Sequence, residues 1–413
     1  MNILIASGSF KDVFSPLESC TVIGDIIKSI DINKKISVKL SPIVDGGEYS
    51  NDVLINSLQC KKIIVDDIIN PYGKKTKSFY LELNSQVAFI SSSEILRLSP
   101  SEDVFKNPLK LTSYGLGQLI VRALKKGYKQ VFIGLGGTNT IDCGIGLAQA
   151  FGINFRNDRD ENILTKNGTY LTGADLNNIN SFSNDWRSKV DTKSSIITLC
   201  DGTATLNQMY TPNMQKIGTY HSNENVIELY RLIESGIKRF KSIVEDHFKK
   251  NNENKYIPID SVKYFGIAGG INLSLSLLFN LKMKLGIEHF IKILNIEDKI
   301  KWADLVITGE GKLDNSLGGK TPIGICKLAK KYNKSTLLIA GDVSNDIKEF
   351  FPNLISKNLP EIFANAGVDN IISCHKYYEK IKLPKNPHDR SKIFKKLTPE
   401  ILAEGIASFL KKV

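Results

Sequence analysis

A short apolar run that ends in glycines and polar residues, followed by a helix start, recurs along this chain of 413 residues. The fullest example runs from Leu305-Val306-Ile307 through Gly309 and Gly311 to Thr321-Pro322. Continuous apolar runs of this kind are typical of strands buried on both faces of a parallel sheet. We expect this strand to stop at the two glycines and a helix to start at Thr321, which can cap it ahead of Pro322. The pattern predicts an α/β protein.

The loop between that strand and that helix has the composition of an anion site. Gly319 lets the backbone approach a ligand, Lys320 adds positive charge, and the first amides of the coming helix point the same way. Glu310 and Asp314 are hard oxygen ligands that suit Mg²⁺ held largely by water and phosphate. Phosphate binding is the favoured interpretation, and an ordinary strand-to-helix connection with a solvated lysine and two surface acids is the alternative.

Two familiar nucleotide motifs are absent from this loop. A Walker A loop needs glycine five residues before Gly319, where this chain has Asp314. The turn also lacks the Gly-x-Gly-x-x-Gly pattern of dinucleotide-binding proteins.

Composition predicts a folded protein with two domains or one large one, because 42% of the residues are hydrophobic. The net charge of +12 comes from dispersed lysines, which favours small acidic substrates and does not specify nucleic acid. Six well-separated cysteines and an N-terminus without a signal-peptide pattern predict a reducing cytoplasm. No apolar stretch is long enough to span a membrane.

The N-terminal segment repeats the strand, loop and helix pattern. A strand at 2–6 leads through Ser9 and Lys11 to Ser15-Pro16-Leu17-Glu18, which has the form of a capping box. Ser9 and Lys11 would then lie near a helix N-terminus, where an anion can bind, although a loop lysine is also commonly just solvated.

A second loop, Asp45-Gly46-Gly47-Glu48, places two carboxylates beside two glycines. Such a pair can chelate a metal or bind hydroxyl groups. The alternative is that one acid is a turn residue and the other belongs to the first turn of a helix.

The third loop follows a buried strand at 131–133 and contains Gly136, Gly137, Thr138 and Thr140, with Asp142 facing it. Free backbone amides and threonine hydroxyls in this loop could hold phosphate or carboxylate oxygens. Tight strand-to-helix packing that needs small residues is the alternative. Asp201 follows another predicted strand at 196–199 and is a metal-ligand or catalytic candidate by its position.

Taken together and in order, these loops resemble the type-1 glycerate kinase family over nearly the whole chain. The segments that carry the resemblance are Ile5-Ala6 to Ser9-Phe10-Lys11, Asp45-Gly46-Gly47-Glu48, Thr112 to Gly117, Gly134 to Gly146, Cys200-Asp201, Ala268-Gly269-Gly270 and Ala303 to Gly324. The resemblance implies transfer of the γ-phosphoryl group of ATP to a hydroxyl of glycerate, with Mg²⁺, on two α/β domains.

This sequence departs from the family pattern at several loops. Gly8 stands where the family has an acid, and Ile141 and Cys143 replace an asparagine and a glycine on either side of Asp142. Asp12 replaces a usual glycine, Thr203-Ala204-Thr205 replaces an acidic-Asn-Pro run, and 314–320 is one residue short and lacks a glutamine. A catalytically impaired ligand-binding or regulatory relative, or a kinase for another small hydroxy acid, are therefore alternatives.

Side-chain chemistry within this resemblance suggests a role for each candidate residue. The catalytic candidates are Lys11, Asp45, Asp142 and Lys320. The candidates for binding ATP are Ser9, Gly136, Gly137, Thr138, Gly309, Gly311, Gly319 and Thr321, and those for Mg²⁺ are Asp201, Glu310 and Asp314.

The predicted architecture is a Rossmann-like domain with a mostly parallel sheet, formed by residues 1–75 and 295–413, with a second α/β domain at 76–294 inserted into it. Glycerate or a similar hydroxy acid and ATP are the expected partners, with no nucleic acid and no membrane. A homo-oligomer is left open.

Overall fold

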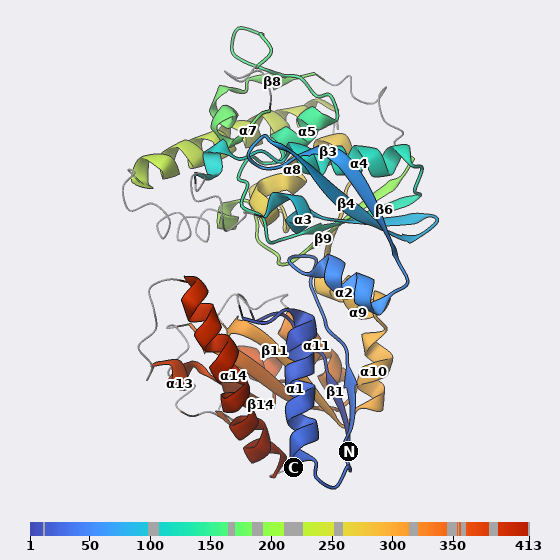
Figure 1. Cartoon of the computed structure of the whole chain (residues 1–413). Helices are drawn as coiled ribbons and strands as arrows, with labels where there is room; N and C mark the ends of the chain where they lie inside the picture. The colour runs from blue at the N-terminus through green and yellow to red at the C-terminus, as the bar shows by residue number, and fades with distance from the viewer. Residues whose placement is uncertain are drawn as a thin grey trace. The chain divides into compact units, whose positions relative to one another are not determined.

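The computed structural model describes residues 1–10, 13–97, 107–163, 170–183, 193–209, 226–251, 259–313, 321–344, 353, 355–356, 361–379 and 387–411. The chain divides into two compact units, and Figure 1 shows segments from both ends of the chain side by side in one of them. Unit 1 comprises Met1–Asp45 and Ile287–Val413, and unit 2 comprises Gly46–Gly286.

Unit 1 is built on a six-stranded sheet with the order β13-β14-β12-β11-β1-β2, parallel except for β13. Its strands are β1 (Asn2–Ile5), β2 (Ser37–Leu40), β11 (Leu305–Leu313), β12 (Ser335–Val343), β13 (Ile355–Ser356) and β14 (Asn370–Ser373). Its helices are α1 (Pro16–Ile30), α9 (Gly286–Ile293), α10 (Ile296–Trp302), α11 (Thr321–Lys331), α12 (Glu361–Asn365), α13 (His375–Glu379) and α14 (Pro387–Leu410).

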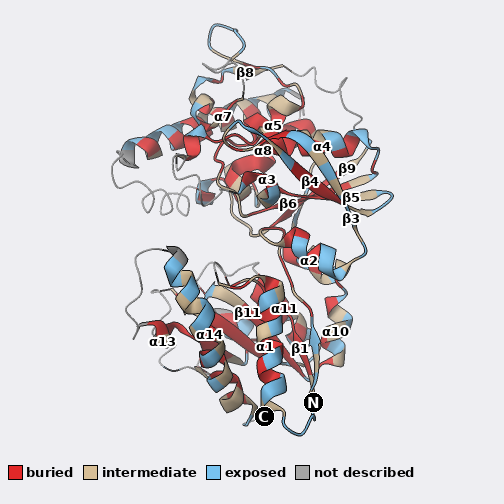
Figure 2. Ribbon diagram, in the orientation of Figure 1, coloured by how far each residue is buried: buried red, intermediate tan, exposed pale blue. Residues whose placement is uncertain are grey.

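Helices cover both faces of this sheet. Along β12, Leu337 and Ile339 join the core that includes residues of α1 and α14, whereas Leu338 and Ala340 join the core beneath α11 and α12. This alternation follows from the two-residue period of a strand. In Figure 2 the central strands β1, β11 and β12 are mostly buried, whereas α1 and α14 contain both buried and exposed residues. The arrangement is Rossmann-like.

The helix α1 begins where the sequence predicts. Ser15 accepts from the Glu18 amide at 3.2 Å, and the Glu18 carboxylate accepts from the Ser15 amide at 2.9 Å. The predicted capping box is confirmed.

Unit 2 is built on a second six-stranded sheet, with the order β10-β9-β6-β5-β4-β3. Its strands are β3 (Lys61–Ile69), β4 (Lys75–Asn84), β5 (Val87–Ser91), β6 (Gln130–Leu135), β9 (Ser195–Cys200) and β10 (Lys282–Leu285), and β7 (Phe155–Arg156) pairs separately with β8 (Ser181–Phe182). Its α-helices are α2 (Ser50–Ser57), α3 (Ser92–Leu96), α4 (Tyr114–Lys125), α5 (Ile145–Ala150), α7 (Val226–Asn251) and α8 (Ile271–Leu278). The short 3-10 turns are η2 (Pro108–Lys110), η3 (Gly173–Asn178), η5 (Asn207–Met209), η6 (Ile259–Ser261) and η7 (Ile267–Gly270).

Strands β5, β6, β9 and β10 are mutually parallel, whereas β3, β4 and β5 pair antiparallel.

The bounds of the two units differ from the predicted domain bounds. Residues 46–75 belong to unit 2, because β3 pairs with β4 in its sheet, and 287–294 belong to unit 1. The strand β3 reaches the sheet of unit 2 through its hairpin partner β4, and the apolar run at 63–65 does not reveal this pairing by itself.

The structure also lengthens the strand that contains Gly309 and Gly311. The expectation that it stops at these glycines is wrong, because β11 continues to Leu313 with Gly309 opposite Ile339 and Glu310 opposite Ala340 of β12. Pairing with a neighbouring strand outweighs the weak strand preference of glycine.

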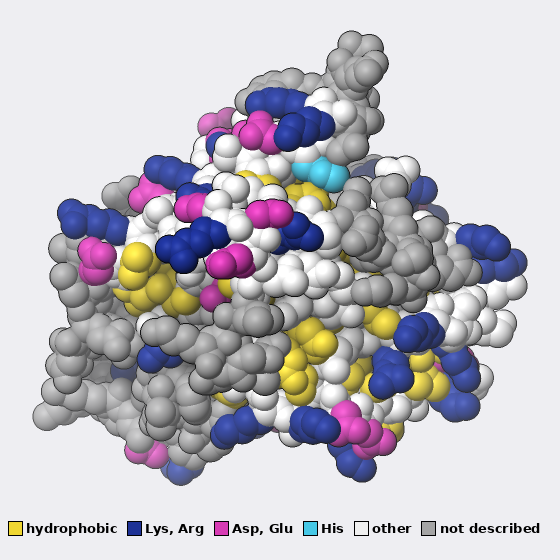
Figure 3. Space-filling model, turned by 90° about the horizontal axis from the view of Figure 1, so that it is seen from above, with side chains coloured by type: hydrophobic (Ala, Val, Ile, Leu, Met, Phe, Trp, Pro, Cys, Tyr) yellow, Lys and Arg dark blue, Asp and Glu magenta, His cyan; other side chains and the backbone are white. Residues whose placement is uncertain are grey.

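In Figure 3 the Lys and Arg side chains on the visible face are interspersed with acidic and uncharged ones and do not gather in one patch. Within the residues that the structure describes, no helix has the length and apolar character needed to cross a membrane. All six cysteines are free thiols.

Candidate active site

In unit 2, three neighbouring parallel strands end at the same edge of the sheet. Ser91 of β5 lies opposite Gly134 of β6, and Leu135 of β6 lies opposite Cys200 of β9. The Asp201 amide donates to the Leu135 carbonyl at 3.0 Å, so the next loop starts in register with its neighbour. The loops after β5, β6 and β9 are thereby brought together, as the sequence predicts for the ends of parallel strands.

Gly136 and Asp201 meet at this edge. A Cβ on Gly136 would lie 2.2 Å from Asp201 Oδ2 and 2.8 Å from the Cα of Gly47, so only glycine fits. The Ser92 hydroxyl donates to the Gly136 carbonyl at 3.2 Å and accepts from its amide at 3.3 Å. The half-buried Asp201 carboxylate therefore lies directly against the glycine loop.

Gly137 meets a second carboxylate. Its φ of +63° is left-handed, and a Cβ there would lie 2.4 Å from Cγ of Glu48. Arg97 Nε lies 3.9 Å from Glu48 Oε1. Thr138 follows Gly137 and is half-buried. Glu48 is not among the predicted site residues, although it stands beside the predicted Asp45 in Asp45-Gly46-Gly47-Glu48, where the paired carboxylates are the signal for it.

Asp142 occupies a different environment from Asp201. Its side chain is fully buried, and its carboxylate accepts from the Ser113 amide at 2.9 Å, the Ser113 hydroxyl at 2.7 Å, the Gly144 amide at 3.0 Å and the Gly146 amide at 3.3 Å. Burial raises the pKa of Asp142, and these four donors oppose that shift. The sequence predicts that Asp142 faces the glycine loop, whereas in the structure its oxygens bond Ser113 and backbone amides at the start of α5.

The family departures on either side of Asp142 are buried as well. Ile141 is 4% exposed and Cys143 is fully buried, and both belong to the apolar core of unit 2. Burial strongly raises the pKa of the Cys143 thiol, which keeps it protonated and unreactive. These two departures therefore alter core packing rather than the exposed side of the glycine loop.

In unit 1, the strand order reverses between β1 and β11. The chain passes from β1 to β2 on one side and from β11 to β12 on the other. Open α/β sheets bind ligands beyond the carboxyl ends of the strands at such a switch point. Ser9, Gly309 and Gly311 lie there.

Backbone hydrogen bonds hold these residues together. The Gly8 amide donates to the Gly309 carbonyl at 3.0 Å, and the Gly311 amide donates to the Ser9 carbonyl at 3.1 Å. A Cβ on Gly309 would lie 2.9 Å from both Ser7 Oγ and Phe10 Cζ, so glycine is required by close packing. Glu310, between the two glycines, is half-buried.

Thr321 links helix α11 to Asp45. The Thr321 hydroxyl donates to Asp45 Oδ2 at 3.3 Å, and Thr321 is the first residue of the helix rather than the cap that precedes it. A carboxylate at a helix N-terminus is stabilised by the free amides there.

The structure thus gathers the predicted residues in two sets. Unit 2 contains Gly136, Gly137, Thr138, Asp142 and Asp201, and unit 1 contains Ser9, Asp45, Gly309, Glu310, Gly311 and Thr321. Lys11, Asp314, Gly319 and Lys320 lie outside the described residues. Across the part of the chain that the structure describes, no three His, Cys, Asp or Glu side chains cluster as metal ligands.

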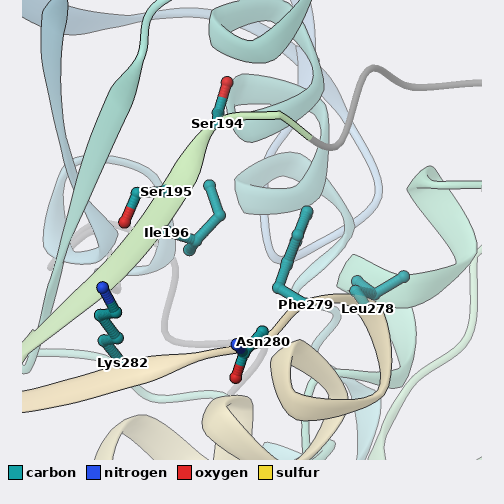
Figure 4. Close-up of a pocket in the computed structure, with 7 residues that line it drawn as sticks. All are labelled: Ser194, Ser195, Ile196, Leu278, Phe279, Asn280 and Lys282. Atoms are coloured by element: carbon teal, nitrogen blue, oxygen red, sulfur yellow. The ribbon is translucent and has the colours of Figure 1, made fainter.

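A cavity of about 440 Å³ lies elsewhere in unit 2 (Figure 4). Its lining comes from the starts of β9 and β10 and the end of α8, namely Ser194, Ser195, Ile196, Leu278, Phe279, Asn280 and Lys282. It therefore opens at the amino ends of these strands, the edge opposite to Asp201, and contains none of the predicted site residues.

Fold and site define an α/β protein with polar, glycine-rich loops at the carboxyl edges of two largely parallel sheets. The model of the glycerate kinase family matches residues 3–374. The chain belongs to the glycerate kinase family, and the family resemblance predicted from the sequence is confirmed.

Known relatives agree with this assignment. A glycerate kinase of Haemophilus influenzae is 32% identical over 382 residues, covering 90% of this chain and 94% of the relative. A glycerate 2-kinase of Escherichia coli K12 is 30% identical, covering 84% and 87%. A crystal structure of a Salmonella typhimurium LT2 protein described as glycerate kinase 2 superposes with a TM-score of 0.67 at 25% identity, covering 100% of this chain and 98% of the other.

These comparisons and the two parallel-dominated sheets confirm the predicted α/β fold class. They also confirm the prediction of an enzyme of the kinase class.

Proposed function

We propose that this enzyme transfers the γ-phosphoryl group of ATP to a hydroxyl of glycerate. The substrate oxygen forms a bond to the γ-phosphorus, the bond from that phosphorus to the β,γ-bridging oxygen breaks, the hydroxyl proton leaves, and ADP is released. Family membership and the relatives' names support the acceptor and the reaction class. ATP as donor follows from the kinase class.

One observation of the structure carries the proposal. The loops after the adjacent parallel strands β6 and β9 bring the Gly136-Gly137 backbone against the Asp201 carboxylate, and the segment before α2 adds the Glu48 side chain. Phosphoryl transfer depends mainly on positioning and on stabilising charge, because the protein needs to supply little covalent chemistry. A glycine backbone that phosphate can approach, next to carboxylates, provides both elements.

The residues present fit a magnesium ion. Mg²⁺ in kinases is held by one or two carboxylates together with water and substrate phosphates, so a cluster of three acidic side chains is not required. Asp201 has the carboxylate type and the position for this role, and Glu310 and Asp314 remain candidates on the other unit. When bound, the ion would neutralise charge on the phosphates.

The remaining assignments follow from position. We assign Gly136, Gly137 and Thr138 to phosphate contacts, and Ser9, Gly309, Gly311 and Thr321 to the ligand-facing edge of unit 1. Gly319 is proposed as a further ATP-binding residue from the sequence. Lys11 and Lys320 are proposed to supply positive charge. Asp45, half-buried and bonded to the Thr321 hydroxyl, is the better candidate for accepting a substrate proton, because Asp142 is fully buried and its carboxylate already accepts four hydrogen bonds.

The deciding experiment is ADP release by the purified protein with Mg-ATP and D-glycerate, compared with ATP alone. ADP formation that depends on glycerate supports the proposal. Testing other small hydroxy acids in place of glycerate identifies a different acceptor, and binding of ATP or glycerate without turnover identifies the catalytically impaired relative. Either of those results would replace the proposed function.

A further inference from the structure

Lys299 on helix α10 is a half-buried cation with an unusual set of neighbours. Its Nζ donates to the Ser41 hydroxyl at 2.8 Å, and Ser41 is only 3% exposed. Ser41 directly follows β2, at the carboxyl edge of the unit 1 sheet, where its amide bonds the Ile5 carbonyl. The lysine is therefore held against the sheet and not extended into solvent.

Positive charge at this place is reinforced rather than neutralised. Lys39 is the charged neighbour of Lys299, and its ammonium lies over the ring of Trp302 at 4.0 Å from the centroid. Burial and then Lys39 lower the pKa of Lys299. Among the described residues, no carboxylate forms an ion pair with either lysine.

A second lysine of the same helix shows the ordinary arrangement. Lys301 lies 3.2 Å from Asp298 and 3.7 Å from Glu297, so both nearby acids of α10 are paired with it. Lys301 is exposed, whereas Lys299 is half-buried, where desolvation disfavours an unpaired ion more strongly. Lys299 has a hydroxyl in place of that partner.

We propose that Lys299, Lys39 and Ser41 form a binding site for a small oxyanion, a carboxylate or phosphate group. The two ammonium groups supply the charge, and the buried Ser41 hydroxyl fixes the position of Lys299. The site lies on the outer side of β2, the last strand of the sheet, where Lys39 is exposed. This inference does not depend on the proposed reaction.

Trp302 provides a direct readout of this site. The chain contains two tryptophans, so Trp186→Phe leaves Trp302 as the single reporter beside Lys39. Emission of this protein is titrated with inorganic phosphate, with D-glycerate and with ATP, each against sodium chloride of equal ionic strength. A saturable change with phosphate is expected, and the glycerate and ATP arms show whether the natural oxyanion is a carboxylate or a nucleotide phosphate.

Lys299→Met should weaken this response about tenfold or more, since a charge-assisted hydrogen bond is lost. Lys39→Met, which leaves the Lys299–Ser41 bond in place, provides a second variant if the first folds poorly, and should also weaken binding. Lys301→Met is the matched control and should bind as the parent does. No saturable response in the parent, equal responses in all variants, or the same change with sodium chloride would overturn the site.

Discussion

The carboxyl edges of the two units hold their polar groups in different ways. In unit 2, the Gly136-Gly137 backbone lies against the side chains of Asp201 and Glu48, so charge and loop are in direct contact. In unit 1, Ser9 and Gly311 are joined by a backbone hydrogen bond, and a single side-chain bond links Thr321 to Asp45.

This difference indicates how the two edges should respond to substitution. Where a carboxylate lies against the loop, removing its charge should act on the proposed reaction. Where backbone bonds hold the loop, removing one side-chain bond acts mainly on local stability. The motif Asp45-Gly46-Gly47-Glu48 spans both cases, because Asp45 belongs to unit 1 and Glu48 to unit 2.

The largest expected effect is that of Asp201→Asn. Loss of this charge should lower kcat by about 10²–10³-fold, because electrostatic groups that act on a transferring phosphoryl group have effects of this size. Steady-state ADP release at saturating substrate measures it. The control is Asp246→Asn on the exposed face of α7, which should keep normal turnover. Normal turnover of Asp201→Asn would remove this residue from the site.

The next largest effect is expected for Gly136→Ala. Its kcat/KM should be lower by about 100-fold, a loss of transition-state stabilisation of about 2.7 kcal/mol. The added Cβ would meet both the Asp201 carboxylate and the Gly47 backbone, and the backbone cannot yield as a long side chain does. Gly202→Ala is the matched control, since its Cβ would lie 3.6 Å from Ile267 Cδ1, an ordinary contact. Equal kinetics of the two variants would show that the loop tolerates displacement.

Asp142→Asn tests the buried aspartate that unit 2 holds behind this loop. An asparagine NH2 group would face amide donors that now bond a carboxylate oxygen. We therefore expect the free energy of unfolding to be lower by about 2 kcal/mol. Urea denaturation measures the loss. Ser113→Ala, which removes one donor to Asp142 and one acceptor for the Leu147 amide, should have a smaller effect of the same sign.

Kinetics of Asp142→Asn distinguish positioning from catalysis. If Asp142 positions the loop, KM for a substrate should rise and the acidic limb of the pH profile should remain. A drop in kcat of about 10²–10⁴-fold with unchanged KM, together with loss of the acidic limb, would instead support Asp142 as a general base.

The sequence predicts the local parts of this comparison well. Apolar runs followed by glycines place Gly136, Asp201 and Ser9 after strands, and the Ser15 capping box sets the start of α1. These features depend on neighbours within a few residues, so a pattern along the chain contains them.

Features that depend on distant residues were not predicted. The burial of Asp142 depends on Ser113, 29 residues earlier, and the continuation of β11 through Gly311 depends on β12. Strands β4 and β10 and the assignment of 46–75 to unit 2 depend on sheet pairing. A sequence pattern shows which residues can pair, and not which partners they find.

The smallest expected effect is that of Thr321→Val in unit 1. This change removes the hydroxyl that donates to Asp45 and keeps the shape of the side chain, so unfolding should require about 1 kcal/mol less. Turnover should fall only a few-fold, as expected for an edge held chiefly by backbone bonds. Thr321→Ser keeps the hydroxyl and should therefore keep the stability and turnover of the parent, as measured by urea denaturation and ADP release. A drop in turnover as large as that of Asp201→Asn would show that the Asp45 carboxylate depends on this bond for chemistry, and the contrast between the two edges would no longer hold.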